Sequence, residues 1–216
     1  ASNETIQGVQ FTTEPQVGNV PLVCDASSDF LSRPVDIGKY GLYYACAQKN
    51  AGPSGLTLVI IRKDLLVRSS ESLPGYLNFQ IHAEAQSLWN TAPTFAIYVF
   101  MLVTKWLITD IGGIDKMQTI NRGKSKLLYD VIDQSSGFYT GHAVPECRST
   151  MNVSFRLPSD ELTNKFVQGA EERGMTDLKG HRSVGGIRAS IYNAMPIAGV
   201  EMLRDFMVEF KERNAK

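Results

Sequence analysis

Two side chains at the ends of neighbouring apolar runs could do chemistry together. Lys49 follows the run Gly41–Ala47, and Asp25 follows the run Val20–Cys24. A lysine amine can condense with a carbonyl group, and an aspartate can keep a ring nitrogen protonated. Each residue also has an ordinary explanation, because a lysine after a strand is usually a solvated charge. An aspartate before Ser-Ser is usually a turn or capping residue.

The apolar runs that would position these residues have the length and composition of β-strands. Together with Leu56–Ile61, they suit strands that are buried on both faces of an α/β sheet. In open α/β sheets, ligands bind beyond the carboxyl ends of the strands. We therefore expect Asp25 and Lys49 to face one ligand from adjacent strand ends.

A long irregular segment and a long apolar helix follow. The segment Arg62–Asn90 contains several turn residues and has weak periodicity, which is typical of a functional or interface loop. Pro93 then introduces a helix from about Thr94 to Ile108. Because this helix is apolar on all sides, we expect it to be buried between layers, where it could connect two domains.

The later part of the chain changes character and predicts an α+β domain. It contains an amphipathic helix at about Asp115–Ile132 and an alternating, half-exposed strand at Met151–Leu157. Ser159 is expected to cap the next helix, with Gly174 beyond its end. A short strand at Gly186–Tyr192 and a final amphipathic helix around residues 200–210 complete the prediction. The predicted domains are residues 1–109 and 110–216.

Composition narrows the class of protein. The chain has 216 residues with 22 basic and 22 acidic side chains, so no global charge favours nucleic acid or a membrane surface. The most apolar stretch, Phe95–Leu107, is too short to span a bilayer. Three cysteines without CxxC spacing favour a reducing compartment over a disulfide or metal site. We expect a soluble, cytoplasmic protein, or a plastid one whose targeting segment was removed.

Several blocks of the sequence closely resemble the phosphoserine aminotransferases, which belong to the class V aminotransferases. They are residues 3–5, 25–28, 31–34, 47–50, 52–55, 90–95 and 179–193. The blocks follow the order of the family with similar spacing, and the last one is long and unusual enough to be highly specific. Cys46 and Val67 depart from the pattern, because the family usually has glycine there.

The resemblance implies an α/β protein with the fold of type I pyridoxal-phosphate (PLP) transferases. Residues 1–109 would be the later part of the large PLP-binding domain, with a mainly parallel sheet, and residues 110–216 the small α+β C-terminal domain. The implied reaction belongs to serine biosynthesis: phosphoserine and 2-oxoglutarate give 3-phosphohydroxypyruvate and glutamate. The alternative is a truncated, non-catalytic form that retains a dimerisation or interaction surface.

The resemblance also implies roles for individual residues. Cofactor contacts are implied for Thr5, Asp25, Gln48, Lys49, Asn90 and Thr91. Lys49 would be the catalytic Schiff-base lysine and the base that moves the substrate proton. Asp25 would pair with the pyridinium of PLP. Asn90 and Thr91 would reach the cofactor phosphate across the interface of a homodimer.

For the substrate, the resemblance implies that Arg188 binds the α-carboxylate and that His181 and Arg182 bind the phosphate from the neighbouring subunit. The ordinary explanation for either arginine is a surface charge. His82 and His142 are interpreted as loop or surface residues, and no metal ligands are expected.

Measured against that family, the matched region is only the later part of the enzyme. The earlier part would supply a helix N-terminus for the PLP phosphate, an aromatic residue stacked on the ring, and further substrate contacts. We therefore expect a fragment, a processed product or a truncated form, which could need a complementary N-terminal segment.

Overall fold

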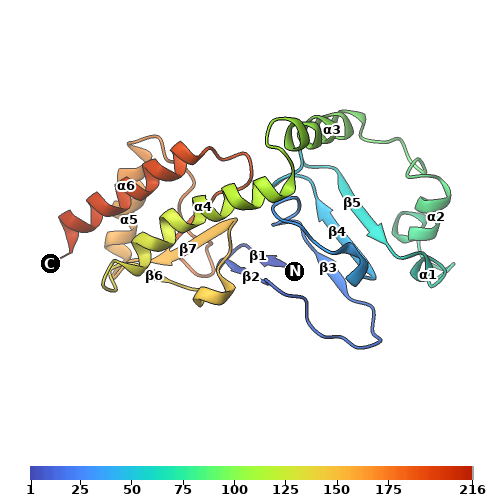
Figure 1. The fold of residues 1–216 in the computed structure, drawn as a ribbon, viewed down its shortest axis with the longest axis horizontal. Coiled ribbons are helices and arrows are strands. Elements are labelled where there is room, and N and C mark those ends of the chain that lie inside the picture. Colours follow the sequence, from blue (N-terminus) through green and yellow to red (C-terminus); the bar gives the residue numbers. More distant parts are fainter. Residues whose placement is uncertain (216) are drawn as a thin grey trace.

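The computed structural model describes residues 1–215, which form two lobes with a short hairpin between them (Figure 1). The hairpin pairs β1 (Asn3–Glu4) with β2 (Val9–Gln10). The first lobe contains β3 (Val23–Asp25), β4 (Leu42–Cys46) and β5 (Thr57–Ile61). The predicted strands in this region are therefore confirmed, with boundaries that differ by a few residues.

The sheet of the first lobe has the order β3-β4-β5 and is mixed. Strand β3 is parallel to β4, whereas β5 is antiparallel to β4, so the expected mainly parallel character holds only for the first pair. Tyr43 and Ala45 on β4 are buried in a small core with Cys24 and Ala26. Burial on both faces was also expected, yet the adjacent Val59 and Ile60 on β5 are 40% and 42% exposed. Within residues 1–215, no element covers either of these side chains fully.

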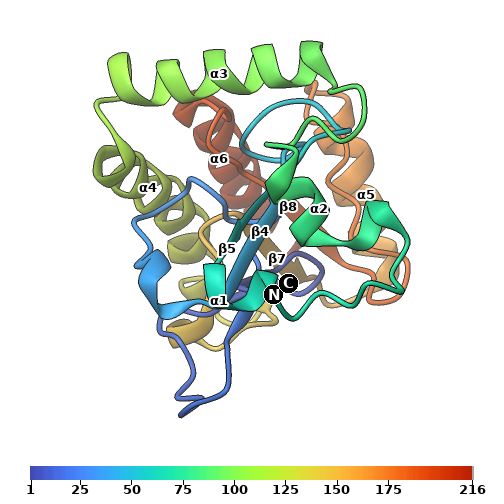
Figure 2. The same ribbon diagram turned by 90° about the vertical axis from the view of Figure 1, so that its right-hand side faces the viewer.

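Three helices follow β5, and the longest lies at the outer edge of the molecule (Figure 2). They are α1 (Lys63–Leu66), α2 (Phe79–Glu84) and α3 (Thr94–Thr109). The position of α3 was predicted correctly, but its expected burial was wrong for this chain. Only Ala96 and Leu107 of α3 are buried, while Phe95 is 74% exposed. The apolar residues that would cover α3 are not supplied by the described residues.

The second lobe packs three helices on one face of an antiparallel sheet. Its strands are β6 (Thr140–Gly141), β7 (Asn152–Arg156) and β8 (Ile187–Ser190). Its helices are α4 (Ile114–Asp133), α5 (Asp160–Glu171) and α6 (Ile197–Asn214). Val153, Phe155, Ile187 and Ala189 face the helices and form the main hydrophobic core with them. This arrangement agrees with the α+β domain predicted from the sequence.

The prediction that β7 is half-exposed was wrong. Its polar residues Asn152 and Ser154 are buried as completely as its apolar ones, because the β1–β2 hairpin covers this second face. The Ser154 hydroxyl donates to the Ile6 carbonyl (3.0 Å), and the Asn3 amide donates to Asn152 Oδ1 (3.0 Å). The apolar and polar residues that alternate along β7 therefore face two different partners. The apolar residues pack on the helices, and the polar residues pack on the hairpin instead of facing solvent.

The ends of α5 follow the expected capping rules. The Ser159 hydroxyl accepts a hydrogen bond from the Leu162 backbone N–H (3.2 Å), and Gly174 adopts a positive φ of 78° beyond the helix. Among residues 1–215, no single helix has the length and apolar character of a membrane span. Helices α3 and α4 reach that threshold only as a pair bent by 86°.

Candidate active site

Lys49 lies in the turn that follows β4, where its amine is half-buried. The turn closes through the Ala47 carbonyl, which accepts from the N–H groups of Ala51 and Gly52 (both 2.9 Å). The Lys49 Nζ donates to the Ser28 hydroxyl at 2.6 Å. Burial lowers the pKa of Lys49, and the positive charge of Arg188 lowers it further, against the opposing effect of Asp25. The net shift increases the fraction of neutral, nucleophilic amine at a given pH.

Asp25 is the last residue of β3 and stands opposite Tyr44 in the parallel register. Its carboxylate accepts hydrogen bonds from the Ser27 backbone N–H (2.9 Å) and the Tyr44 hydroxyl (3.1 Å). Burial raises the pKa of Asp25, but the hydrogen bonds from Ser27 and Tyr44 outweigh this effect and hold the pKa below its usual value. Asp25 is therefore a carboxylate at neutral pH and suits a cationic partner.

Arg188 reaches this region from the second lobe. It lies on β8 directly opposite Ser154 of β7, so its side chain is on the face of the sheet that meets the hairpin. Among the described residues, its buried Nε atom has no hydrogen-bond partner. A guanidinium with a free, buried donor suits a carboxylate ligand.

The charges of Asp25 and Arg188 thus both act on the pKa of Lys49. Asp25 comes from β3 in the first lobe and Arg188 from β8 in the second. A cavity of about 390 Å³ adjoins Lys49, which is within the size range of small-molecule sites. Asp25 and Arg188 do not line this cavity, whose lining residues are Lys49, Asn50, Gly52, Leu102, Val103, Trp106, Asn193 and Ala194.

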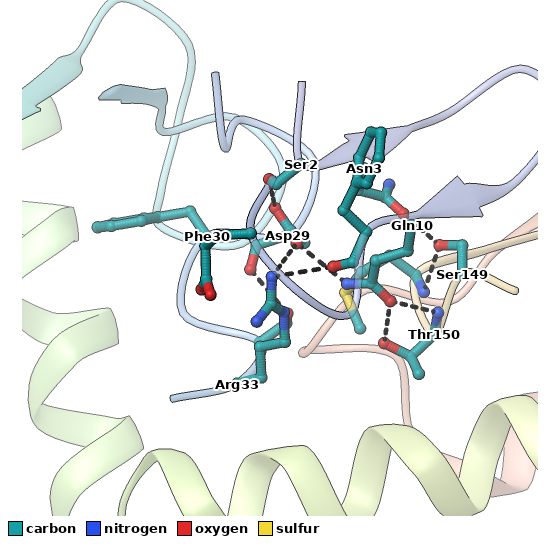
Figure 3. Close-up of polar contacts among 12 residues, drawn as sticks. Ser2, Asn3, Gln10, Asp29, Phe30, Arg33, Ser149 and Thr150 are labelled. Carbon is teal, nitrogen blue, oxygen red and sulfur yellow. Dashed lines mark hydrogen bonds and ion pairs between the residues drawn. The ribbon is translucent and has the colours of Figure 1, made fainter. Parts of the chain in front are cut away.

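A buried polar network around Asp29 holds the hairpin against both lobes (Figure 3). Asp29 is 2% exposed and accepts hydrogen bonds from the Ser2 hydroxyl and from Gln10 Nε2 (3.0 Å for the latter). Arg33 neutralises it across 3.6 Å, and Gln10 Oε1 accepts from the Thr150 backbone N–H at 3.1 Å. The network joins the first lobe, the hairpin and the start of β7.

The hairpin carries Thr5 in its turn, next to the sheet face that bears Arg188. Gly8, at the end of this turn, has φ +74°, and its carbonyl accepts from the Ser149 N–H at 2.9 Å. A Cβ at Gly8 would lie 2.4 Å from the Asn152 carbonyl oxygen. Glycine is therefore required for the turn to approach β7 so closely.

Other predicted site residues are not joined to this group within the chain. Gln48, Asn90 and Thr91 are exposed, the last two on the segment before α3. In residues 1–215, no hydrogen bond or ion pair connects any of them to Lys49. Their proposed cofactor contacts therefore stay predictions.

His181 and Arg182 lie in the loop before β8, and Arg182 is exposed. The His181 Nδ1 is 2.7 Å from the Ser183 hydroxyl. The loop folds back tightly, since the Gly180 N–H donates to the Gly186 carbonyl at 2.8 Å. Their phosphate-binding roles likewise stay predictions.

Sequence reasoning missed the residues that complete the site. Neither Tyr44 nor Ser28 was predicted as a site residue, yet the Tyr44 hydroxyl contacts Asp25, and the Ser28 hydroxyl contacts the Lys49 amine. The register of β3 with β4 was the missing information for Tyr44. The two serines after Asp25 were a usable signal, because hydroxyl groups directly after a strand end lie beside the same ligand region.

Comparison with known proteins identifies the family. The aminotransferase class-V family model matches residues 1–203, and the chain belongs to this family. It is 62% identical over 215 residues to a phosphoserine aminotransferase of Rhodopirellula baltica, covering 99% of this chain and 57% of that protein. A phosphoserine aminotransferase of Lysinibacillus sphaericus is 53% identical over 213 residues, with coverages of 99% and 59%.

Solved structures agree with this assignment. The phosphoserine aminotransferase from Bacillus circulans subsp. alkalophilus superposes with a TM-score of 0.95 at 51% identity, covering 99% of this chain and 59% of that one. A PLP-bound phosphoserine aminotransferase from Trichomonas vaginalis gives a TM-score of 0.90 at 42% identity, with coverages of 96% and 58%. The expected fold of type I PLP transferases is confirmed, and the chain spans somewhat less than three fifths of these relatives.

Proposed function

We propose that this chain carries the lysine-bearing part of the active site of a PLP-dependent phosphoserine aminotransferase. The reaction would exchange an amino group between phosphoserine and 2-oxoglutarate. The observation that carries the proposal is the half-buried Lys49 amine of lowered pKa, which lies within the electrostatic influence of both Asp25 and Arg188. The names of the similar proteins support the same reaction.

The residues present fit the cofactor. When bound, PLP supplies an aldehyde and an electron-withdrawing ring. Asp25 is ionised and can hold a proton on the ring nitrogen, and its position is fixed by Ser27 and Tyr44. The lowered pKa of Lys49 increases its fraction of neutral amine, the form that can attack a carbonyl and accept a proton from the substrate Cα. Ser28 orients that amine.

The free, buried Nε of Arg188 supports binding of the substrate α-carboxylate. His181 and Arg182 would bind the phosphate of phosphoserine from a second subunit. The remaining cofactor contacts are assigned to Thr5, Gln48, Asn90 and Thr91, the last two across the interface of a homodimer.

Attachment of PLP to one lysine tests the proposal. Incubating the chain with PLP should produce a visible absorption band, and borohydride reduction should leave the cofactor on Lys49 in peptide mass spectra. Lys49→Ala should lose both signals. Lys126→Ala removes an exposed lysine that pairs with Asp130 on the same helix, and this variant should keep both signals. A band that persists in Lys49→Ala would refute the proposed role of this lysine.

A second candidate function is a non-catalytic form that retains a dimerisation or interaction surface. Its support is the exposed apolar surface of α3, where Phe95, Tyr98 and Ile108 are each more than half exposed. Self-association in sedimentation experiments without PLP attachment would favour this candidate. Recovery of transamination on adding a polypeptide equivalent to the unmatched part of the relatives would favour the enzyme, completed by an N-terminal segment.

A further inference from the structure

A chain of buried amide side chains leads from the residue next to Lys49 into the second lobe. Asn50 Oδ1 accepts from the Asn193 backbone N–H at 3.0 Å. The Asn193 side chain donates to the Leu31 carbonyl at 2.9 Å and accepts from Asn121 Nδ2 at 2.8 Å. Asn50, Asn121 and Asn193 are all buried. The Lys49 turn is therefore tied to the segment that follows β8 and to helix α4.

Lys124 holds the same segment from the other side. It lies one helical turn after Asn121 on α4 and has no solvent-exposed surface. Its ammonium donates to the carbonyls of Ile191 (3.0 Å), Tyr192 (2.7 Å) and Met195 (3.1 Å). Three carbonyls satisfy the three N–H bonds of the ammonium. A buried charge is costly even when it is hydrogen-bonded, so a lysine here needs a reason beyond core packing.

The segment that Lys124 and Asn193 hold begins immediately after the strand that carries Arg188. Ile191 is three residues beyond Arg188, and its backbone N–H donates to the Met151 carbonyl at 2.8 Å. A shift of residues 191–195 would therefore move the end of β8 and Arg188 with it. Lys49 and Arg188 are far apart in the sequence, so their relative position depends on contacts such as these and not on the covalent chain between them.

We propose that Asn193, Asn121 and Lys124 are positioning residues that fix the place of Arg188 beside the Lys49 amine across the two lobes. The inference rests on the proposed function, in which Arg188 holds the substrate carboxylate while Lys49 moves the substrate proton. Misplacing a positioned group by about 1 Å can slow such a reaction on the order of 100-fold. The hydrogen bonds of these three residues set that placement before any substrate binds.

The proposal can be tested without the cofactor, through the effect of Arg188 on Lys49. The positive charge of Arg188 lowers the pKa of Lys49, so the Lys49 amine reports where Arg188 lies. We would measure this pKa from the pH dependence of the acetylation rate of Lys49, followed by mass spectrometry. Arg188→Gln should raise the pKa and slow acetylation at neutral pH by roughly two- to tenfold.

The decisive variant is Asn193→Leu, which removes the amide without changing the charge. If the proposal holds, Asn193→Leu raises the pKa of Lys49 in the same direction as Arg188→Gln, and the double variant shows no further rise. Leucine makes the surroundings of Lys49 more apolar, which by itself would lower the pKa. A rise therefore reports the displacement of Arg188.

The proposal is overturned if Asn193→Leu leaves the pKa of Lys49 unchanged or lowers it, or if the rises in the double variant add. It is also overturned if Arg188→Gln has no effect. Asn121→Leu provides a second variant that also leaves the charge unchanged, and it should act like Asn193→Leu.

Tyr139→Phe is the matched control. It removes another buried hydrogen bond of the second lobe, from the Tyr139 hydroxyl to the Met207 carbonyl (2.8 Å), and should leave the pKa of Lys49 unaltered. Because acetylation needs no PLP, failure of the chain to take up PLP would count against the proposed function and leave this test intact.

Discussion

At the scale of single residues, the candidate site depends on how each charged group is solvated and paired. The surroundings of Lys49 and Asp25 lower the pKa values of both side chains, which suits their proposed roles. Burial makes the lysine amine a better nucleophile, whereas two hydrogen bonds keep the aspartate ionised. The chemistry is therefore determined by the neighbours, above all Ser27, Ser28 and Tyr44.

Tyr44→Phe tests the contribution of the tyrosine to Asp25. Removing the hydroxyl deletes one hydrogen bond to the carboxylate, so the pKa of Asp25 should rise toward its usual value. Carboxyl 13C NMR titration of the chain would measure the shift. Tyr40→Phe alters a hydroxyl that lies near Glu14 instead and should leave the titration of Asp25 unchanged. An unshifted pKa in Tyr44→Phe would show that this hydrogen bond does not contribute.

At the scale of elements, the hairpin β1–β2 decides how the two lobes meet. It contacts β7 through Asn3 and Ile6 and the preceding Ser149 through Gly8. It contacts the first lobe through Ser2 and Gln10. If β7 were exposed, as the sequence predicted, the hairpin would not pack against it. Docking of the hairpin instead buries the polar face of β7.

Gly8→Ala should destabilise the protein more than a glycine substitution made in open space. The alanine Cβ would meet the Asn152 carbonyl at 2.4 Å in a backbone with φ +74°, and we expect a loss of about 2–4 kcal/mol. Gly18→Ala has a similar φ of +58° but no neighbour within 4 Å, and should cost about 1–2 kcal/mol. Urea denaturation would measure both. Equal losses would mean that the approach to β7 contributes nothing to stability.

At the scale of the whole molecule, the described chain combines a well-packed second lobe with a first lobe that leaves apolar surface open. The second lobe has a continuous core around Phe155, Phe166 and Met207, whereas α3 and β5 expose large apolar side chains. Buried polar residues at the junction between the lobes hold them in one arrangement. Lys124, which is buried within the second lobe against the carbonyls of residues 191–195, makes the stability of the chain depend on pH.

Burial lowers the pKa of Lys124 to about 8 from 10.5. Between about pH 8 and 10.5 the unfolded chain therefore binds more protons at this residue, so its contribution to stability rises with pH through this window. Relative to Lys124→Met, the wild-type free energy of unfolding should increase by up to about 3 kcal/mol across the window. Urea denaturation at several pH values would measure the difference. Parallel pH profiles of the two proteins would contradict the assignment.

Sequence alone was sufficient for features that depend on a few neighbouring residues. The strand ends at Asp25 and Lys49, the extent of α3 and α4, and the Ser159 cap follow from local composition and periodicity, and the ordered motifs indicated the family. These features can be predicted locally because helix ends depend on capping residues that are close in sequence. The extent of a helix or strand follows from the repeating pattern of its apolar side chains.

Only the tertiary structure decided what each face touches. It showed that the hairpin covers β7, that Tyr44 contacts Asp25, that Arg188 influences Lys49, and that Lys124 is buried among backbone carbonyls. On the amphipathic helix α4, Lys124 falls on the same stripe as the buried Met117 and Leu128, which was the available signal. The physical reason is that burial and charge pairing depend on partners far away in the sequence, and periodicity does not specify those partners.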